Sequence, residues 1–231
     1  MKRRPLIIAH RGFSGKCPEN TLAAIRAALA LGVDMVEIDV HETHDGELVV
    51  FHDYRLDRLC GVRERVRDVT WARLQRLNPA VPTLADVLRV CRGRARVLVE
   101  IKRADPRKVA ATITRQRMEH EVIVFSQSVA CMKTLAVANP RIPRFGVIVR
   151  DLRHSARRIQ SSVVVRGVGL NRQLLTSRMV RNRPPLASWK VFVWTVNRAS
   201  DMRRFADWGV DGIITNRPDV ALAAVTAAGS R

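Results

Sequence analysis

The sequence predicts an α/β fold of the (β/α)8 class, the TIM barrel, and two observations support this prediction. Short apolar runs rich in β-branched residues recur along the 231-residue chain, and such runs are typical of buried parallel strands. A segment with helical spacing or a helix-starting residue follows each run, and eight such units fit a barrel of roughly 200–250 residues. The predicted strands begin near residues 6, 35, 97, 122, 145, 163, 191 and 212.

The first strand is expected at residues 6–9. Pro18 marks the start of a helix, because proline is favoured in the first helical turn, and this helix over 19–31 ends at Gly32. The second strand is expected at 35–40. These elements make the first strand–helix unit and open the second.

An Asp45-Gly46 pair between two extended runs predicts a β-hairpin after the second strand. Symmetry about this pair places position 52 opposite position 39, and therefore His52 beside Asp39. The return strand is extra to the eight strands of the barrel. Residues 53–81 then form a short, irregular and polar insertion, with a helical turn near 71–77.

In the remaining chain, Thr83 is expected to cap a helix over 82–91, with Asp86 in its first turn. Strands and helices then alternate without a linker or a low-complexity segment, so we expect a single domain over 1–231. Further strands are expected at 97–101, 122–125, 145–149, 163–168, 191–196 and 212–215, and further helices at 105–118, 129–138, 151–159, 172–180, 199–208 and from Pro218 onwards.

The chain is strongly basic, with 41 Lys and Arg against 21 Asp and Glu and a formal net charge of +20. Such a charge attracts polyanions: nucleic acid, an anionic membrane surface or small phosphates. The basic residues are spread along the whole chain, and only one Tyr and six Phe are present to stack bases. We therefore expect no specific nucleic-acid partner, and favour a solubilising arginine-rich surface.

Neither a membrane span nor a secretory signal is expected. No apolar run approaches the roughly 20 residues of a transmembrane helix, and the basic stretch before the first strand is too short for an apolar targeting region. The four cysteines are widely spaced and include no CxxC pair, which indicates free thiols in a reducing compartment and favours a cytoplasmic location.

Acidic side chains gather where the predicted strands end. Glu37 and Asp39 are two residues apart on a strand and so share a face, and Glu100 and Lys102 do the same. Buried carboxylates that point together are tolerated when a cation lies between them, and Mg²⁺ or Ca²⁺ suits oxygen ligands. The alternative is exposed acids paired with arginines, but three acids at strand ends in a chain short of acids favour a metal site.

Two histidines also follow strands, and His10 and His52 are candidates for acid and base because imidazole transfers protons near neutral pH. Arg11 and Lys102 could hold a phosphate. Asp53 could orient a histidine. The other histidines are predicted to be surface residues: His41, His44, His120 and His154.

The sequence resembles the glycerophosphodiester phosphodiesterase family through an ordered set of motifs that spans nearly the whole chain. Any one of them is weak, but the set in family order is highly specific. The motifs are His10-Arg11-Gly12, Pro18-Glu19-Asn20-Thr21, Glu37-Ile38-Asp39-Val40, Thr43-His44-Asp45-Gly46, Val49-Val50-Phe51-His52-Asp53, Pro82-Thr83-Leu84, Glu100-Ile101-Lys102, Trp194-Thr195-Val196-Asn197 and Asp211-Gly212-Ile213-Ile214-Thr215-Asn216-Arg217-Pro218.

The resemblance implies a (β/α)8 barrel that cleaves glycerophosphodiesters, with a divalent metal, to an alcohol and glycerol 3-phosphate. It implies the metal ligands Glu37, Asp39 and Glu100 and the acid–base pair His10 and His52. It places Arg11 and Lys102 near the phosphate, Trp194 near the substrate and Glu19 in a supporting role. A core aromatic is the alternative for Trp194.

Two departures from the family pattern concern the pocket for the alcohol. The segment from His52-Asp53 to Pro82 is short for the family, and Gln127 follows Ser126 where an aromatic residue is expected. The alternatives are a lysophospholipase D-like or sphingomyelinase D-like phosphodiesterase and, from another class, a non-catalytic binder of nucleic acid or anionic membrane.

Overall fold

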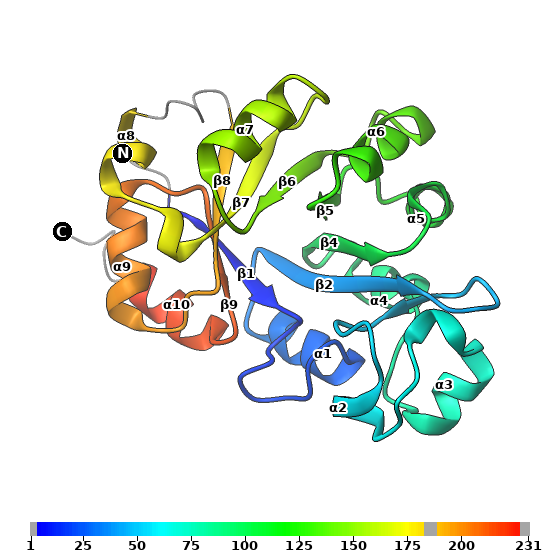
Figure 1. Cartoon of the computed structure of the whole chain (residues 1–231). Helices are drawn as coiled ribbons and strands as arrows, with labels where there is room; N and C mark the ends of the chain where they lie inside the picture. Colours follow the sequence, from blue (N-terminus) through cyan, green and yellow to red (C-terminus); the bar gives the residue numbers. More distant parts are fainter. Residues whose placement is uncertain (1–3, 183–188, 227–231) are drawn as a thin grey trace.

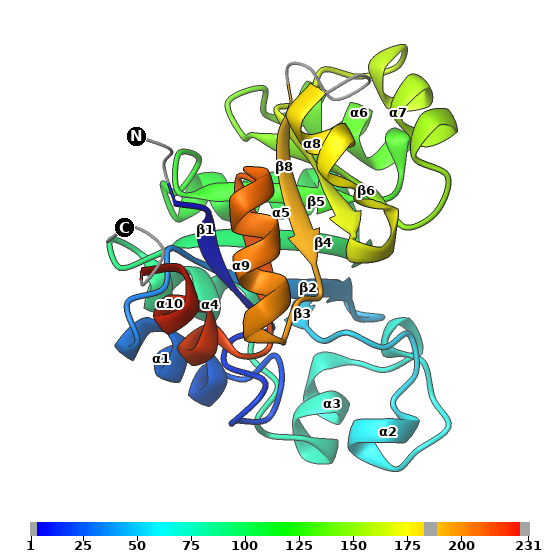
Figure 2. The same cartoon turned by 90° about the vertical axis from the view of Figure 1, so that its left-hand side faces the viewer.

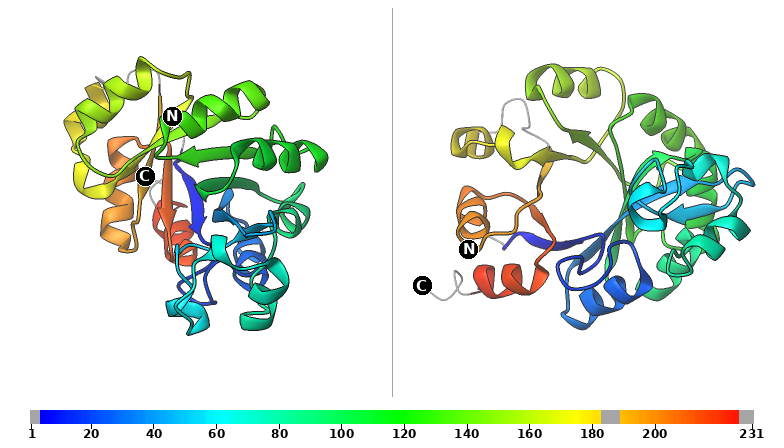
Figure 3. Two further views of the ribbon diagram at one scale, coloured as in Figure 1. Left: turned by 45° about the vertical axis from the view of Figure 1, so that its right-hand side comes forward. Right: turned by 60° about the horizontal axis from the view of Figure 1, so that its bottom comes forward.

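Eight parallel strands close into a barrel, with helices around its outside (Figures 1 and 3). The computed structural model describes residues 4–182 and 189–226. Going round the barrel, the strand order is β1, β9, β8, β7, β6, β5, β4 and β2, and β2 pairs with β1 to close the ring. The TIM-barrel prediction is confirmed. The strands are β1 (Leu6–His10), β2 (Met35–Glu42), β4 (Arg96–Arg103), β5 (Val122–Ser126), β6 (Arg144–Ile148), β7 (Gly167–Asn171), β8 (Lys190–Trp194) and β9 (Gly212–Thr215).

A helix follows each barrel strand except β2, whose chain first makes the return strand β3 (Leu48–Val50) and the insertion. The predicted capping box of α4 is present: Thr83 accepts from the Asp86 N–H while the Asp86 carboxylate accepts from the Thr83 N–H. The barrel helices are α1 (Leu22–Ala30), α4 (Leu84–Cys91), α5 (Pro106–Arg115), α6 (Val129–Ala138), α7 (Leu152–Gln160), α8 (Ser177–Asn182), α9 (Ala199–Trp208) and α10 (Pro218–Thr226).

The apolar core has two layers, one between strands and helices and one inside the barrel. Inside, Phe125, Phe145 and Phe192 pack together, with centroids of the last two 4.8 Å apart. Glycines on neighbouring strands make room for these rings: a Cβ at Gly167 would lie 2.4 Å from Phe145, and one at Gly169 would lie 2.6 Å from Phe125. The barrel interior is therefore a packed core below the site.

The hairpin forms, but its register differs from the prediction by one residue. Val40 pairs with Val50, and the Phe51 N–H donates to the Asp39 carbonyl at 2.9 Å, so residue 51 rather than His52 lies opposite Asp39. The turn is longer than an Asp-Gly pair, because Asp45 accepts from the Thr43 hydroxyl and from the Trp71 N–H instead of making a two-residue loop.

Strand β7 begins four residues later than predicted, at Gly167 rather than at 163. The β-branched run before Gly167 led to the earlier predicted start. The strand itself contains Gly167 and Gly169, a residue type that normally weakens a strand but is required here by the phenylalanines. The helix predicted over 172–180 is divided into a 3₁₀ turn, η2 (Arg172–Leu174), and α8.

The insertion is a small unit with its own core, beside β2 and β3 (Figures 1 and 2). It contains α2 (Asp57–Cys60), the 3₁₀ turn η1 (Val66–Asp68) and the predicted helix α3 (Trp71–Leu77). Its buried side chains are Val49, Phe51, Leu56, Val66, Val69, Leu74 and Val81. This core fixes the chain that leaves β3 and carries His52.

None of the helices in the described ranges is long and apolar enough to cross a membrane. Most of the basic N-terminal stretch considered as a targeting segment lies outside the described residues.

Candidate active site

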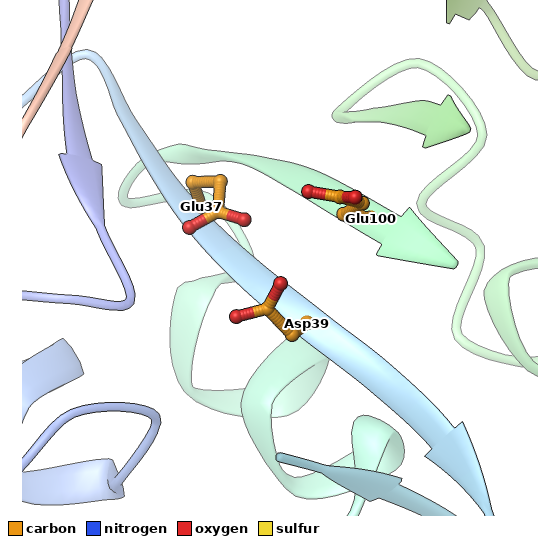
Figure 4. Close-up of side chains that lie close together, drawn as sticks. All are labelled: Glu37, Asp39 and Glu100. Atoms are coloured by element: carbon orange, nitrogen blue, oxygen red, sulfur yellow. The ribbon is translucent and has the colours of Figure 1, made fainter. Parts of the chain in front are cut away.

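Three carboxylates converge at the end of two neighbouring strands (Figure 4). Glu37 and Asp39 lie on β2, and Asp39 pairs in register with Glu100 on β4. Ligand oxygens of the three groups all lie within 4.8 Å of one another. Glu37 and Asp39 are 3% and 1% exposed, so water cannot separate their charges. A hard divalent cation fits this set of oxygen donors.

The pKa values of the three acids are shifted in different directions. Burial, with the charges of Asp39 and Glu100, raises the pKa of Glu37 well above its usual value. Burial also raises the pKa of Glu100. For Asp39 burial acts in the same direction, but the positive charges of Lys102 and Arg11 outweigh it and lower the pKa. The three carboxylates carry more negative charge than the neighbouring cationic side chains neutralise, as expected of a cation site.

Two cations flank Asp39. Lys102 Nζ lies 3.2 Å from Asp39 Oδ1 and 2.8 Å from Glu100 Oε1, and Arg11 Nε lies 3.2 Å from Asp39 Oδ2. The Arg11 backbone N–H donates to Glu37 Oε2 at 2.9 Å. Within the described ranges, Arg11 Nε is a buried donor without a hydrogen-bond acceptor. Its nearby anionic partner is the Asp39 carboxylate.

Asn20 is a buried residue of the site that the sequence did not single out. Its Nδ2 donates to Asp39 Oδ2 at 3.0 Å, and its Oδ1 accepts from the Asp39 N–H at 3.4 Å. Its backbone is in the left-handed region at φ 58°, a conformation that asparagine tolerates better than most residues. This turn also explains why α1 begins at Leu22, three residues after the predicted start.

His10 ends β1 and is held by a neutral partner. Its Nδ1 lies 2.6 Å from Asn216 Oδ1, an acceptor, so Nδ1 carries the proton and Nε2 presents a lone pair. Nε2 lies 4.0 Å from Glu37 Oε2. Burial, together with the positive charge of Arg11, lowers the pKa of His10 to about 4. His10 is therefore a neutral imidazole.

His52 follows β3 and is held by a charged partner. Its Nδ1 lies 2.7 Å from Asp53 Oδ1. Arg58 of α2 donates to the other Asp53 oxygen at 2.6 Å and also to Glu19 Oε1 at 2.5 Å. Glu19 in turn accepts from Arg11 Nη1 at 3.0 Å. A chain of charged contacts thus joins His52 to Arg11 across the mouth of the barrel.

His41 is not a surface residue, and its prediction as one was wrong. It is 2% exposed, and its Nε2 lies 3.1 Å from the His52 carbonyl oxygen. Burial lowers its pKa to about 4. The alternation of β2, which turns residues 37, 39 and 41 to one side, could have placed it with the acids. His44, His120 and His154 are exposed, as predicted.

A pocket of about 240 Å³ lies over the acids. Its lining includes both candidate histidines and also Phe125, Ile214, Trp194 and Gln127. Trp194 Nε1 is buried and has no hydrogen-bond acceptor in the described ranges. The pocket thus combines charged side chains with aromatic and aliphatic ones.

Residues 10–220 match the glycerophosphoryl diester phosphodiesterase family. The chain belongs to this family. A glycerophosphodiester phosphodiesterase of Caldanaerobacter subterraneus subsp. tengcongensis is 30% identical over 241 residues, which cover 95% of this chain and 97% of the relative. The prediction that the chain is an enzyme of this family, a phosphoric diester hydrolase, is confirmed.

Solved structures of other proteins have a similar fold. Glycerophosphodiester phosphodiesterase from Agrobacterium tumefaciens has a TM-score of 0.80 at 29% identity, covering 95% of this chain and 99% of its own. A phosphodiesterase of Oleispira antarctica, in complex with the product sn-glycerol-3-phosphate, has a TM-score of 0.85 at 24% identity, covering 96% and 97%. The second likeness is one of fold.

The residues predicted as the site of this phosphodiesterase-family barrel come together. Seven of them line the pocket: His10, Arg11, Glu37, His52, Glu100, Lys102 and Trp194. Asp39 lies against Arg11 and Lys102, while Glu19 and Asp53 contact Arg11 and His52 from behind. The sequence reasoning missed the partners that hold these groups, namely Asn20, Arg58 and Asn216.

Proposed function

We propose that this chain hydrolyses glycerophosphodiesters to an alcohol and glycerol 3-phosphate in a metal-dependent reaction with two histidines as acid and base. The observation that carries the proposal is the cluster of Glu37, Asp39 and Glu100, with oxygens within 4.8 Å of one another. Glu37 and Glu100 of this cluster line the pocket that His10 and His52 also line. A structural neighbour has sn-glycerol-3-phosphate as its bound product, which supports the same product here.

The three carboxylates would hold one divalent cation, Mg²⁺ or Ca²⁺. A bound cation would neutralise negative charge on the phosphate as the P–O bond to the alcohol breaks. Lys102 and Arg11, which both line the pocket, would add positive charge from the protein beside a phosphate oxygen. Trp194 would place its aromatic ring against the glycerol.

The two histidines have different partners, which suggests different roles. The His10 Nδ1–H donates a hydrogen bond to Asn216 Oδ1, which leaves a lone pair on Nε2. That lone pair suits a general base that deprotonates the attacking hydroxyl. His52 Nδ1 contacts the Asp53 carboxylate, which would orient the ring, and we assign His52 as the general acid that protonates the leaving alkoxide. Over the whole reaction one water is added, its hydroxyl to phosphorus and its proton to the alcohol.

Glu19 and Asp53 would act through other residues, by fixing the positions of Arg11 and His52.

We propose that residues 1–231 form one domain with this activity. Glycerophosphocholine and glycerophosphoethanolamine are the first substrates to test, and the cytoplasmic location stays a prediction.

The test is a screen of glycerophosphodiesters and lysolipids with Mg²⁺, with Ca²⁺ and with excess chelator, in which released glycerol 3-phosphate and free alcohol are both measured. We expect both products in equal amounts and no turnover in chelator. Full turnover after dialysis against chelator would contradict the metal dependence. Choline release from lysophosphatidylcholine, with no action on glycerophosphocholine, would favour a lysophospholipase D-like enzyme.

A further inference from the structure

A second pocket, of about 360 Å³, lies on the insertion side of the barrel mouth and is lined by four arginines. We name it the arginine pocket; its lining residues are His41, Tyr54, Arg55, Arg65, Arg67 and Arg103. No carboxylate is among them. Its positive charge comes from three separate segments, β4, the stretch after β3 and the stretch around η1.

The backbone brings like charges together here. Arg55 and Arg65 face each other in an isolated antiparallel bridge, and like charges directly opposite each other destabilise such a pair. Arg103 joins them because β4 carries an irregularity: Val40 pairs with Ile101 but His41 with Arg103, so one residue of β4 is skipped. Bulges of this kind redirect side chains near active sites. An anion between the guanidinium groups would remove the repulsion.

The protein's own acids balance only part of this charge. Arg55 pairs with Asp57 at 2.8 Å, and Arg67 lies 3.5 Å from Asp68. In the described part of the chain, neither Arg65 nor Arg103 has a carboxylate within ion-pair distance. Arg103 instead lies over the Tyr54 ring, 5.5 Å from its centroid, and Tyr54 packs edge-on against His41. These ring contacts position the Arg103 guanidinium at the pocket.

The arginine pocket is joined to the candidate active site by an intermediate pocket, also of about 360 Å³. The intermediate pocket shares His52 and Lys102 with the active site, and Tyr54 and Arg55 with the arginine pocket. His41 of the arginine pocket also contacts His52 of the active site, because His41 Nε2 lies 3.1 Å from the His52 carbonyl oxygen. His52, the proposed proton donor to the leaving alcohol, therefore lines both the active site and the intermediate pocket.

We propose that the arginine pocket binds a second phosphate, carried by the alcohol part of the substrate, so that the preferred diesters are those whose alcohol is itself phosphorylated. This rests on the proposed function. Guanidinium groups bind phosphate through paired N–H donors, which suits a dianion better than the ammonium of choline or ethanolamine. The chemical step is unchanged: the P–O bond to the alcohol breaks, and the phosphorylated alcohol leaves with the proton from His52.

The experiment compares two substrates that differ by one phosphate, glycerophosphoglycerol and its terminal phosphate monoester. Two charge-assisted contacts at a partly solvated site should give the monoester about tenfold higher kcat/KM. In the double variant Arg65→Gln/Arg103→Gln this preference should fall to about one, while kcat/KM for glycerophosphoglycerol stays within about twofold of the parent. The preference should also decrease with added salt, because exposed charges are screened.

The matched control is Arg63→Gln/Arg76→Gln. It removes the same charge from exposed arginines of the same insertion that do not line the arginine pocket. It should keep the preference, and if it loses as much as the test variant, long-range charge rather than the pocket is responsible and the proposal fails. Both variants change exposed side chains, so their melting temperatures should match the parent.

Three outcomes separate the explanations. Turnover of neither substrate would contradict the proposed function itself. Equal turnover of both by the parent would leave that function intact and overturn the second-phosphate proposal. Inorganic phosphate should inhibit the monoester reaction in the parent more strongly than in Arg65→Gln/Arg103→Gln. If it instead changed glycerophosphoglycerol turnover in the parent alone, the arginine pocket would bind free phosphate as an effector, and the proposal would fail.

Discussion

Asn20 and Asp39 hold each other through two hydrogen bonds, side chain to side chain at 3.0 Å and backbone N–H to amide oxygen at 3.4 Å. Lys102 and Arg11 also contact the carboxylate, at Oδ1 and Oδ2 respectively. The carboxylate of Asp39 thus has a fixed orientation before any cation binds. A fixed carboxylate binds a cation more tightly, because less freedom is lost on binding.

The variant Asn20→Gly tests this orientation. Glycine accepts the positive φ of position 20 without strain, so the change removes the amide and leaves the backbone free to keep its turn. Loss of such an outer partner typically weakens metal binding 10–100-fold, and we expect about tenfold weaker Mg²⁺ binding in calorimetry. Unchanged affinity with lowered activity would show that Asn20 acts on something other than the cation.

Glu100→Gln tests the third proposed ligand with a nearly isosteric change. An amide is a much weaker cation ligand than a carboxylate, so we expect Mg²⁺ affinity to fall by at least about tenfold while the circular dichroism spectrum is retained. The control is Glu42→Gln, which removes an ion pair with Lys108 near the end of β2 and lies outside the acid cluster. Equal affinities in the two variants would remove Glu100 from the ligand set.

The strands and the acids were predictable, because both depend on local pattern. Apolar runs marked the strands, and alternation put Glu37 and Asp39 on one face before any tertiary contact was known. His52 lies at the site, but not through the predicted pairing opposite Asp39, a position that Phe51 takes. The hairpin symmetry was off by one residue because Asp45 bonds to Trp71, a contact 26 residues away that no turn rule contains.

The supporting residues were harder to predict because their roles arise only from folding. Arg58 joins Glu19 and Asp53 across 39 and 5 residues of sequence, and nothing around Arg58 distinguishes it from the many other arginines. Gly167 is of a residue type that normally weakens a strand, but here its lack of a Cβ is what admits Phe145. Such contacts are properties of the packed barrel.

Gly12→Ala should disturb both stability and activity. Gly12 has φ 77°, and a Cβ there would lie 2.6 Å from the Ala24 carbonyl carbon, so the backbone after Arg11 must move. The control is Gly32→Ala, at φ 73° with nothing within 4 Å of the added Cβ. Gly32→Ala should lower the free energy of unfolding by about 1–2 kcal/mol, because alanine is strained at this positive φ. This corresponds to roughly 2–8 °C in Tm, and activity should be kept.

Gly12→Ala should lower Tm further than this control and should also lower kcat, because His10 and Arg11 directly precede it. Thermal melts and initial rates on the same preparations measure both effects. Equal Tm values for the two variants would show that the loop relaxes around the new methyl group.

The histidine variants test the mechanism most directly. Proton transfer by a positioned side chain is worth typically ~10²–10⁴-fold, so His10→Ala and His52→Ala should each lower kcat by at least ~10²-fold. The double variant should lose much less than the product of the two losses, because groups that serve one step are not additive. Initial rates on glycerophosphocholine measure all three.

A p-nitrophenyl diester of glycerol phosphate then separates the roles. Its leaving group needs little protonation, so it should restore much of the activity of the variant that lost the acid and little of the variant that lost the base. His52 is the proposed acid, and burial with the charge of Arg11 lowers the pKa of His10 and favours its neutral form, so His52→Ala should be the rescued variant. Rescue of His10→Ala instead would exchange the two roles. If His52→Ala kept nearly full activity on every diester, its contact with Asp53 would be structural, and a mechanism with two histidines would be wrong.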